Sequence, residues 1–348
     1  MSRRVYLDYN ATAPLRLEAR DAMSAAMDVI GNPSSVHAEG RAAKALVERA
    51  RGQIAEAFGT SGADIVFTSS ATEAAGLACA GRGLASAAIE HEAVGAWTCG
   101  TLPVTAHGAV TVDDPARSVM QSANSETGIT QDLPQGLALS DMTQSFGKQP
   151  VSFAWSGAEA AMISAHKLGG PKGIGALVLR QGLDLVPQIK GGGQEMGRRS
   201  GTENIIGIAG FGAAAAAAMR DLQAGVWERV AELRKILENA IETAAPDTIL
   251  IGKQVPRLPN TCCFATPGWK GETQVMAMDL AGFAISAGSA CSSGKVRASK
   301  VLLAMGYDAV TAASAVRASL GPETTEDEVL RFADAWSKAH QKFQAKAA

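Results

Sequence analysis

The sequence has no large excess of charge of either sign and no long uninterrupted apolar run. Its formal net charge is −2 over 348 residues, which gives no electrostatic reason to expect nucleic acid or an acidic membrane surface as a partner. No apolar signal core follows the N-terminal arginines. The longest nearly apolar stretch, residues 205–219, is interrupted by glycines and too short to span a membrane, so we expect a packed helix there.

The cysteines also lack a recognisable pattern. They form no Cys-x-x-Cys pair and no disulfide-scaffold spacing, and we expect no metal ion in the site. An odd number of thiols in a chain without a signal peptide favours the reducing cytoplasm and leaves room for one reactive thiol. The five cysteines are Cys79, Cys99, Cys262, Cys263 and Cys291.

Apolar residues are plentiful, at 47% of the chain, which suffices for a large core and, at this length, about two domains. Their periodicity predicts alternating helices and short buried strands, followed from Thr248 by a smaller α+β pattern. We predict a large domain over residues 14–225 and a small domain formed by residues 1–13 with 226–348. The predicted helices include 15–30, 39–58, 203–222 and 226–244, and the predicted strands include 64–68, 87–89, 103–105, 110–112, 119–121, 137–141, 160–163 and 175–179.

The most informative segment is residues 164–173, where Lys167 follows a buried strand and precedes a glycine-rich turn. A lysine is almost never fully buried unless its charge is paired or consumed. A Schiff base with an aldehyde cofactor would consume it, and the glycines would let the backbone approach an aromatic ring and its phosphate. The alternative, a surface lysine beside an ordinary turn, stays open from this segment alone.

A second segment, residues 69–75, joins a buried strand directly to the start of a helix. Free backbone amides and the helix dipole at such a junction bind phosphate. Ser70 and Glu73 also fit a capping box, so the segment is equally compatible with an ordinary capped helix. Both interpretations can hold together.

Polar residues recur at the carboxyl ends of the predicted strands, where ligands bind in open α/β sheets. Two loops add further polar groups: residues 31–37, with Asn32, and the glycine- and arginine-rich residues 191–202. The second loop either cradles an anion or is a flexible surface loop. The polar residues at strand ends are His91, Ser125, Asp141, Gln144, His166 and Lys167.

With these segments assembled, the chain resembles the cysteine desulfurases of the NifS and IscS class. This resemblance implies an α/β fold, that of the PLP-dependent transferases (aspartate aminotransferase-like, fold type I). Such a fold has a large mixed-sheet cofactor domain and a smaller α+β domain. The motifs that carry the resemblance, in order, are residues 6–12, 31–35, 70–73, 141–144, 164–167, 199–202 and 288–291.

The resemblance also implies a cofactor, pyridoxal 5'-phosphate (PLP), and a role for each residue around its ring. Lys167 would bind the cofactor covalently and later move the proton on the substrate Cα. Asp141 would keep the pyridine nitrogen protonated, so that the ring accepts electrons. His91 would lie on the face of the ring and take part in catalysis. Gln144 would donate a hydrogen bond to the phenolic oxygen.

Other residues would bind the phosphate and the substrate. The phosphate would be held by the amides of Ala71 and Thr72 and by Ser164 and His166. Thr202 would reach the phosphate of the partner subunit, which makes the active site a property of a homodimer. The substrate carboxylate would be bound by Asn32 and Arg317, since a guanidinium offers a bidentate fork.

The resemblance further assigns Cys291 as the nucleophile that accepts sulfur. It lies in a segment of small residues, 286–294, that is able to flex. Its thiolate would attack the sulfur of bound cysteine and carry it away as a persulfide, with alanine released. We expect the other four cysteines to be inert thiols.

The sequence departs from the family pattern in three places. Ser125 occupies the second position of a usual asparagine pair, where the family contacts the ring oxygen of the cofactor. The region from 81 to 141 is short and leaves no room for a crossover helix between Gly128 and Leu137. The chain stops at Ala348, without the longer tail with which some relatives dock a scaffold protein.

From these observations we expect a cytoplasmic, homodimeric L-cysteine desulfurase that supplies persulfide sulfur to an acceptor protein for iron–sulfur cluster assembly. Another reaction of the same fold, an aminotransferase or a selenocysteine lyase, is the first alternative. The second is a degenerate paralogue that acts as a scaffold.

Overall fold

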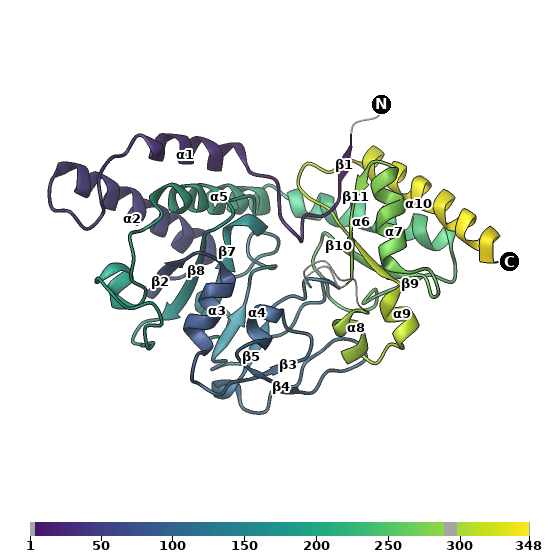
Figure 1. Cartoon of the computed structure of the whole chain (residues 1–348), viewed down its shortest axis with the longest axis horizontal. Helices are drawn as coiled ribbons and strands as arrows, with labels where there is room; N and C mark the ends of the chain where they lie inside the picture. The colour runs from purple at the N-terminus through teal and green to yellow at the C-terminus, as the bar shows by residue number, and fades with distance from the viewer. Residues whose placement is uncertain (1–3, 289–297, 348) are drawn as a thin grey trace.

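The structure is a computed structural model that describes residues 4–288 and 298–347 (Figure 1). Its largest sheet is mixed, with strand order β2-β8-β7-β6-β5. Strands β5, β6 and β7 run parallel, whereas β8 is antiparallel to both β7 and β2. These strands span Ala63–Thr68 (β2), Val119–Gln121 (β5), Leu139–Asp141 (β6), Ala160–Ser164 (β7) and Gly175–Arg180 (β8).

Three helices pack together on one side of this sheet: α1 (Leu17–Met27), α2 (Ala38–Phe58) and α5 (Ile205–Gln223) (Figure 1). Small residues let them approach closely, because a Cβ added to Gly212 would lie 2.6 Å from the Cα of Ala50. Within the described residues, only α5 is long and apolar enough by length and composition to cross a membrane. Phe211 and most of its alanines are instead buried, as the sequence predicted for this stretch, and Ala214, Ala215 and Ala218 pack in the core with α2 and the sheet.

The sheet's other side is covered by α3 (Ala71–Cys79) and the short α4 (Glu92–Gly95), which close a second apolar cluster against β7 and β8. A two-stranded parallel sheet of β3 (Ala85–Ala87) and β4 (Cys99–Leu102) lies next to them. Short 3-10 helices occupy Pro115–Arg117, Phe153–Trp155, Ala165–Lys167 and Gln194–Gly197.

The second part of the molecule is built on an antiparallel sheet with strand order β12-β13-β10-β9. Helix α6 (Val226–Ala244) and helix α10 (Glu326–Ala347) pack on it around a core that contains Trp336. Helices α7 (Gly271–Leu280), α8 (Lys300–Ala304) and α9 (Ala309–Ala313) complete it. Its strands are Ile249–Leu250 (β9), Thr261–Ala265 (β10), Ser286–Ala287 (β12) and Ala315–Ser319 (β13).

The N-terminal segment belongs to this second part. Strand β1 (Val5–Tyr6) pairs in parallel with β11 (Phe283–Ala284), and Leu7 is fully buried in the same core as α6 and α10. The chain then crosses to α1 and the large sheet (Figure 1). A further apolar cluster joins the two parts, since Ile89 and Ile129 pack with Cys263 and Val301. The division of the chain into 14–225 and 1–13 with 226–348 stays a prediction.

The connection from β5 to β6 is short, as predicted from the spacing. Residues 122–138, all of them described, contain no helix, although β5 and β6 are parallel neighbours. Two predicted strands, 103–105 and 110–112, were wrong: this stretch forms a single antiparallel bridge between Val104 and Val110. The strand predicted at 87–89 lies two residues earlier, and α1 is shorter at both ends than the predicted 15–30.

Candidate active site

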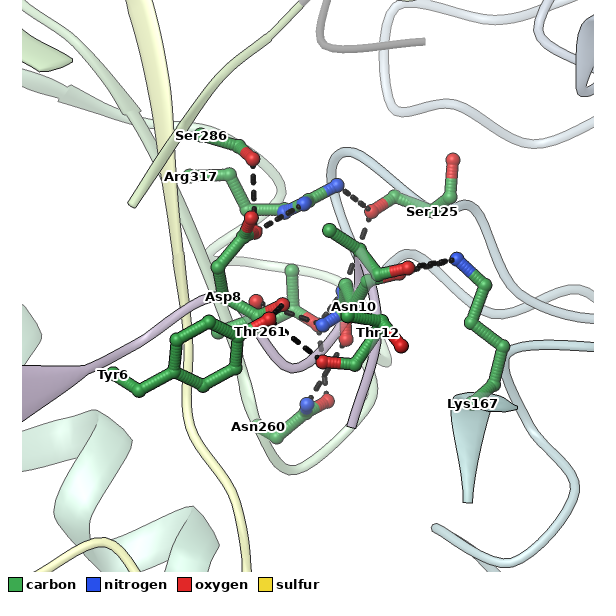
Figure 2. A network of polar contacts seen from close by, with 12 residues as sticks. Tyr6, Asp8, Asn10, Thr12, Ser125, Lys167, Asn260, Thr261, Ser286 and Arg317 are labelled. Atoms are coloured by element: carbon green, nitrogen blue, oxygen red, sulfur yellow. Dashed lines mark hydrogen bonds and ion pairs between the residues drawn. The ribbon is translucent and has the colours of Figure 1, made fainter. Parts of the chain in front are cut away.

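Lys167 follows β7 directly, in the 3-10 helix Ala165–Lys167. The turn after it depends on Gly169, whose φ of +87° and close approach to Arg16 leave no room for a side chain. Nζ of Lys167 donates to the backbone oxygen of Asn10 at 2.6 Å and to that of Ala11 at 2.9 Å (Figure 2). The lysine therefore points at the N-terminal segment and not at bulk solvent.

A cavity of about 260 Å³ lies in front of this lysine, close to the usual size of a small-ligand pocket, about 300–1,000 Å³. Both parts of the molecule contribute to it, since its walls come from the large sheet, the N-terminal segment and β13. Asp141 is the only carboxylate among the described residues that line it. The predicted site residues that the structure brings together there are Ala71, Thr72, His91, Ser125, Asp141, Gln144, Ser164, His166, Lys167 and Arg317.

One end of the cavity is the start of α3. Ser70 caps this helix by accepting from the amide of Glu73 at 3.4 Å, so the first half of the predicted capping box is confirmed. The carboxylate of Glu73 accepts from the amide of Ser69 at 2.8 Å and pairs with Arg199 at 2.7 Å. The helix thus begins at the cavity wall with its N-terminal dipole toward it. Gly175 backs this junction, where a Cβ would lie 3.0 Å from the nitrogen of Ala71.

His166 lies beside Lys167, with its Nδ1 3.2 Å from the hydroxyl of Thr12. Burial lowers the pKa of His166 to about 4, and the nearby charges of Lys167, Lys172 and Lys148 act in the same direction. The imidazole is therefore neutral at pH 7, and the cations around it make this end of the cavity suited to an anion.

Asp141 ends β6, and its Oδ1 accepts from the amide of Thr143 at 2.9 Å. Another acid, Glu90, is enclosed nearby and accepts from the amide of Gln121 at 2.8 Å. Burial raises the pKa of Glu90 well above its ordinary value, with the charge of Asp141 as a further cause. Of these two acids, Asp141 lines the cavity, whereas Glu90 lies behind its wall. His91 starts α4, and its Nδ1 accepts from the amide of Ala93 at 3.1 Å.

Arg317 projects from β13 at the opposite side of the cavity and is 3% exposed. Its Nη2 lies 2.7 Å from the carboxylate of Asp8, and its Nη1 donates to the backbone oxygen of Ser125 at 2.9 Å (Figure 2). Ser286 also donates to Asp8, at 2.8 Å. The guanidinium is therefore held in place before any substrate arrives, with its Nε buried and without a partner in the described part of the chain.

Asn10 links the two sides of the site. Its side-chain nitrogen, Nδ2, donates to the hydroxyl of Thr261 at 2.9 Å. Its side-chain oxygen, Oδ1, accepts from Asn260 at 3.0 Å and from Lys148 at 2.9 Å. Its backbone oxygen accepts from Gln144 at 3.0 Å as well as from Lys167. Figure 2 shows Asn10 between Lys167 on one side and Asn260 and Thr261 on the other.

This geometry agrees with known proteins. The family description Aminotransferase class-V matches residues 5–94 and 112–332. The chain belongs to the class-V aminotransferase family. It is 34% identical to a protein named cysteine desulfurase IscS from Dictyoglomus turgidum, over 99% of this chain and 96% of the other. It is 37% identical to a cysteine desulfurase from a Frankia species, over 96% and 91%.

A solved structure gives the same result for the fold. The NifS-like protein from Rickettsia africae is 30% identical, with a TM-score of 0.88 over 97% of this chain and 100% of the other. The predicted fold type I architecture is therefore confirmed. The alignment with the Dictyoglomus protein spans 380 positions, more than the 348 residues here, and the family match omits residues 95–111. The first fact means that this chain has gaps relative to the Dictyoglomus protein.

Class-V aminotransferases and cysteine desulfurases are PLP enzymes, and the cavity fits that cofactor. The fit rests on the lysine amine, the start of α3 with its cationic surroundings, and the carboxylate of Asp141. The hydroxyl of Thr143 is a further buried polar atom at the cavity that has no partner among the described residues. The residues that would hold PLP are Lys167, Asp141, His91, Gln144, Ala71, Thr72, Ser164 and His166.

Two predicted residues do not reach this cavity within one chain. Asn32 is exposed, and its Oδ1 accepts from the amide of Ser34 at 2.9 Å. Thr202 borders a separate cavity of about 190 Å³, together with Ser69 and Arg199. The loop that carries Thr202 is fixed by buried Glu195, which adopts a φ of +47°. Their assignments to substrate and phosphate stay predictions.

The contact of Ser125 is made by its backbone. Its carbonyl oxygen accepts from Arg317 and, at 3.2 Å, from Asn10, so this position acts on the site through the main chain. The adjacent Asn124 shapes the turn by accepting from the amides of Glu126 and Thr127, at 2.9 Å each.

The predicted nucleophile, Cys291, lies outside the described residues. On the N-terminal side of its segment, Ser286 of β12 pairs with Arg317 of β13. On the C-terminal side, Ser299 caps α8 and donates to the buried carboxylate of Glu126 at 2.5 Å. The described ends of the segment therefore both lie beside groups at the substrate side of the cavity.

Three important residues were missed by sequence reasoning: Asp8, Asn10 and Lys148. The first two lie in a motif that carries the resemblance, residues 6–12, but neither was given a role in the site. Lys148 is four residues after Gln144 and stands between Gly147 and Gln149, so no local pattern marked it as buried.

Proposed function

We propose that the protein is a PLP-dependent L-cysteine desulfurase, which converts L-cysteine to L-alanine and retains the sulfur. The observation that carries the proposal is the placement of Lys167 and Arg317 in one cavity, the first at the cofactor side and the second preorganised for a carboxylate. The near-full-length similarity to proteins named cysteine desulfurases supports the choice of substrate.

Each residue of the cavity has a task. When bound, PLP supplies an electron sink for the negative charge that develops on the substrate Cα. The amine of Lys167 moves the proton at that carbon. Asp141 holds a proton on the ring nitrogen, and the start of α3 with neutral His166 binds the phosphate. Arg317 orients the substrate through its carboxylate.

Sulfur transfer is assigned to Cys291. Its thiolate forms a bond to the sulfur of the substrate as the Cβ–sulfur bond breaks, and Cβ gains a proton to become the methyl group of alanine. The electron pair of the broken Cβ–sulfur bond stays with Cβ, so carbon is reduced to a methyl group while the transferred sulfur is oxidised to sulfane sulfur, and no external oxidant is required. Of the four other thiols, Cys79, Cys262 and Cys263 are buried, and burial raises the pKa of each, to about 11 for Cys79 and about 12 for Cys263.

The proposal includes a homodimer in which Thr202 reaches the phosphate of the partner's site, and it keeps Asn32 as a ligand of the substrate carboxylate. The exposed apolar side chains of Ile30, Val36 and Met196 lie in the same two loops and support a shared surface there. The proposal also includes a protein that accepts the persulfide sulfur, used for iron–sulfur cluster assembly in the cytoplasm, where thiols stay reduced.

The test is to incubate the purified holoenzyme with L-cysteine and to measure alanine and sulfide with and without reductant. Equal amounts of alanine and reductant-released sulfide are expected, with sulfane sulfur found on Cys291 by mass spectrometry. Cys291→Ser should bind cysteine, seen as a spectral change, without turnover, whereas Cys99→Ser, at an exposed thiol, is the matched control and should keep full activity.

Other results would assign a different function. A 2-oxo acid in place of alanine would indicate an aminotransferase. Turnover of selenocysteine but not of cysteine would indicate a selenocysteine lyase. Absence of any cofactor band would indicate a scaffold.

A further inference from the structure

A second lysine, Lys148, is buried directly behind the site, and the proposed function gives it no role. It is 1% exposed and donates from Nζ to Oε1 of Gln144 at 2.6 Å and to Oδ1 of Asn10 at 2.9 Å. Both partners are neutral amides. Burial of an amine without a carboxylate is costly, so its presence here calls for a reason.

The first consequence concerns the amide of Gln144. Its nitrogen donates to the backbone oxygen of Asn10 at 3.0 Å, and a carbonyl oxygen can only accept. The amide oxygen of Gln144 must then face Lys148. The amine of Lys148 has at least two N–H groups whether or not it is protonated, so it can donate to Gln144 and to Asn10 at once. One N–H of Gln144 is left for the cavity that this residue lines.

The second consequence concerns Asn10. Its side chain is held at the oxygen by Lys148 and Asn260 and at the nitrogen by Thr261, all within 3.0 Å. Its backbone oxygen is thereby presented to Nζ of Lys167 at 2.6 Å. Lys148 is thus joined through one residue to the amine that would bind the cofactor.

Lys148 does not line the active-site cavity. It borders a second cavity, of about 290 Å³, on the far side of Lys167, together with Tyr9 and Trp227. Burial lowers the pKa of Lys148 well below its ordinary value, with the charges of Lys167 and Arg317 as further causes. The amine therefore acts from behind the site and does not reach the substrate.

We propose that Lys148 is a positioning residue for the reaction: it orients the amide of Gln144 so that an N–H faces the cavity, and it fixes Asn10 beneath Lys167. This inference rests on the proposed function, because Gln144 would donate that N–H to the ring oxygen of PLP. A donor at this oxygen favours its deprotonated form, so correct orientation of Gln144 lowers the pH at which the lysine-bound cofactor loses its proton.

The experiment is a pH titration of the cofactor absorbance in the holoenzyme. Lys148→Met replaces the amine by an apolar chain of similar length. We expect the midpoint of the titration to rise by about half a unit to one unit, the equivalent of one lost hydrogen bond. A purely structural role for Lys148 would change the melting temperature without moving this midpoint.

A double-mutant cycle distinguishes an effect of Lys148 on the orientation of Gln144 from a direct effect of the charge of Lys148 on the cofactor. Gln144→Met should raise the midpoint by itself, and adding Lys148→Met to it should raise it no further if Lys148 acts through Gln144. Lys172→Met is the matched control, since Lys172 is exposed on the turn after the site and also acts on His166 by its charge. It should leave the midpoint within about 0.2 units of the wild type, the size expected for an exposed charge.

The inference is overturned if Lys148→Met titrates as the wild type, or if its shift is the same with and without Gln144. A wild type without any titrating band would instead refute the proposed function. Should Lys148→Met fail to fold, a holoenzyme crystal structure at about 1.2 Å decides the point from the amide hydrogens of Gln144. An amide nitrogen facing Lys148 would contradict the inference.

Discussion

The carboxylate of Asp8 lies 2.7 Å from Nη2 of Arg317, and this ion pair joins the N-terminal segment to the strand that carries the substrate-binding arginine. The arginine side chain is 3% exposed and the aspartate side chain 17%. A pair this enclosed is held with little freedom, so the direction of the guanidinium is set before substrate enters.

Asp8→Asn should raise KM for L-cysteine by about tenfold, because a charge-assisted hydrogen bond of about 1.5–3 kcal/mol positions Arg317. Steady-state kinetics measure this, with kcat expected to change less. Asp279→Asn is the matched control: its pair with Arg4 also anchors the N-terminal segment, but both side chains are more than half exposed. A lower KM in Asp8→Asn would show that Asp8 competes with the substrate carboxylate.

Lys167→Ala should abolish the absorbance band of the lysine-bound cofactor and reduce turnover by at least about 10³-fold, since the amine of Lys167 is the group proposed to move the proton at the substrate Cα. Absorbance spectra of the purified variant and alanine release check the two effects. Lys172→Ala, at an exposed lysine on the same turn, should keep the band. A normal band in Lys167→Ala would show that a different amine binds PLP.

Complementation should reveal a shared active site. Lys167→Ala and Thr202→Asp subunits are each expected to be nearly inactive, the second because a carboxylate repels the phosphate. In a mixed dimer, one of the two sites would combine the intact lysine of one subunit with the intact threonine of the other. Activity in the mixture near a quarter of the wild type is expected for random pairing, since half of the dimers are mixed and each has one good site. No recovery in verified mixed dimers would place Thr202 outside the partner's site.

The free energy of unfolding should fall as the pH rises, because Glu126 loses its proton. Burial raises its pKa to about 7, although the hydrogen bond from Ser299 and the charges of Arg317 and His91 oppose this. The folded state thus binds the proton more tightly than the unfolded state, whose ordinary value is 4.5. The contribution of this proton to the free energy of unfolding is fully present below pH 4.5 and is lost as the pH rises past 7. The loss is on the order of 3 kcal/mol.

Glu126→Gln removes that titration while keeping an oxygen that can accept from Ser299. Its melting temperature should exceed that of the wild type more at pH 8 than at pH 5. Chemical denaturation at the two pH values gives the same comparison in free energy. Glu323→Gln, outside this cluster, is expected to show no such difference. Parallel curves for the wild type and Glu126→Gln would mean that Glu126 is not the titrating group.

Local patterns predicted much of this molecule. The capping box between Thr325 and Glu328 at the start of α10 is present, with both hydrogen bonds, at 3.1 and 3.3 Å. Helix α6 has the predicted bounds because its apolar face repeats regularly and Gly225 precedes it. The site residues at strand ends lie together because parallel strands place their carboxyl ends at one edge of a sheet.

The features that the sequence did not predict depend on contacts between residues far apart in the chain. Ile30 was predicted to be helical, yet it lies beyond the end of α1 and is 88% exposed. Asn10 and Asn260 are 250 residues apart in sequence, and no local pattern predicts that they meet. Lys148 could not be recognised as buried for the same reason, because its surroundings are supplied by the N-terminal segment.

The pairing of Val5 with Phe283 has a consequence for how the protein is made. Ribosomes add about 5–20 residues per second, so roughly 14–56 s separate the synthesis of the two strands. During this time the large sheet can fold, whereas Ser286 and Arg317, which hold Asp8, have not yet been made. Capture of PLP is therefore expected only after Arg317 has been made, and residues 5–10 are among the last of the site to be fixed in place although they are translated long before it.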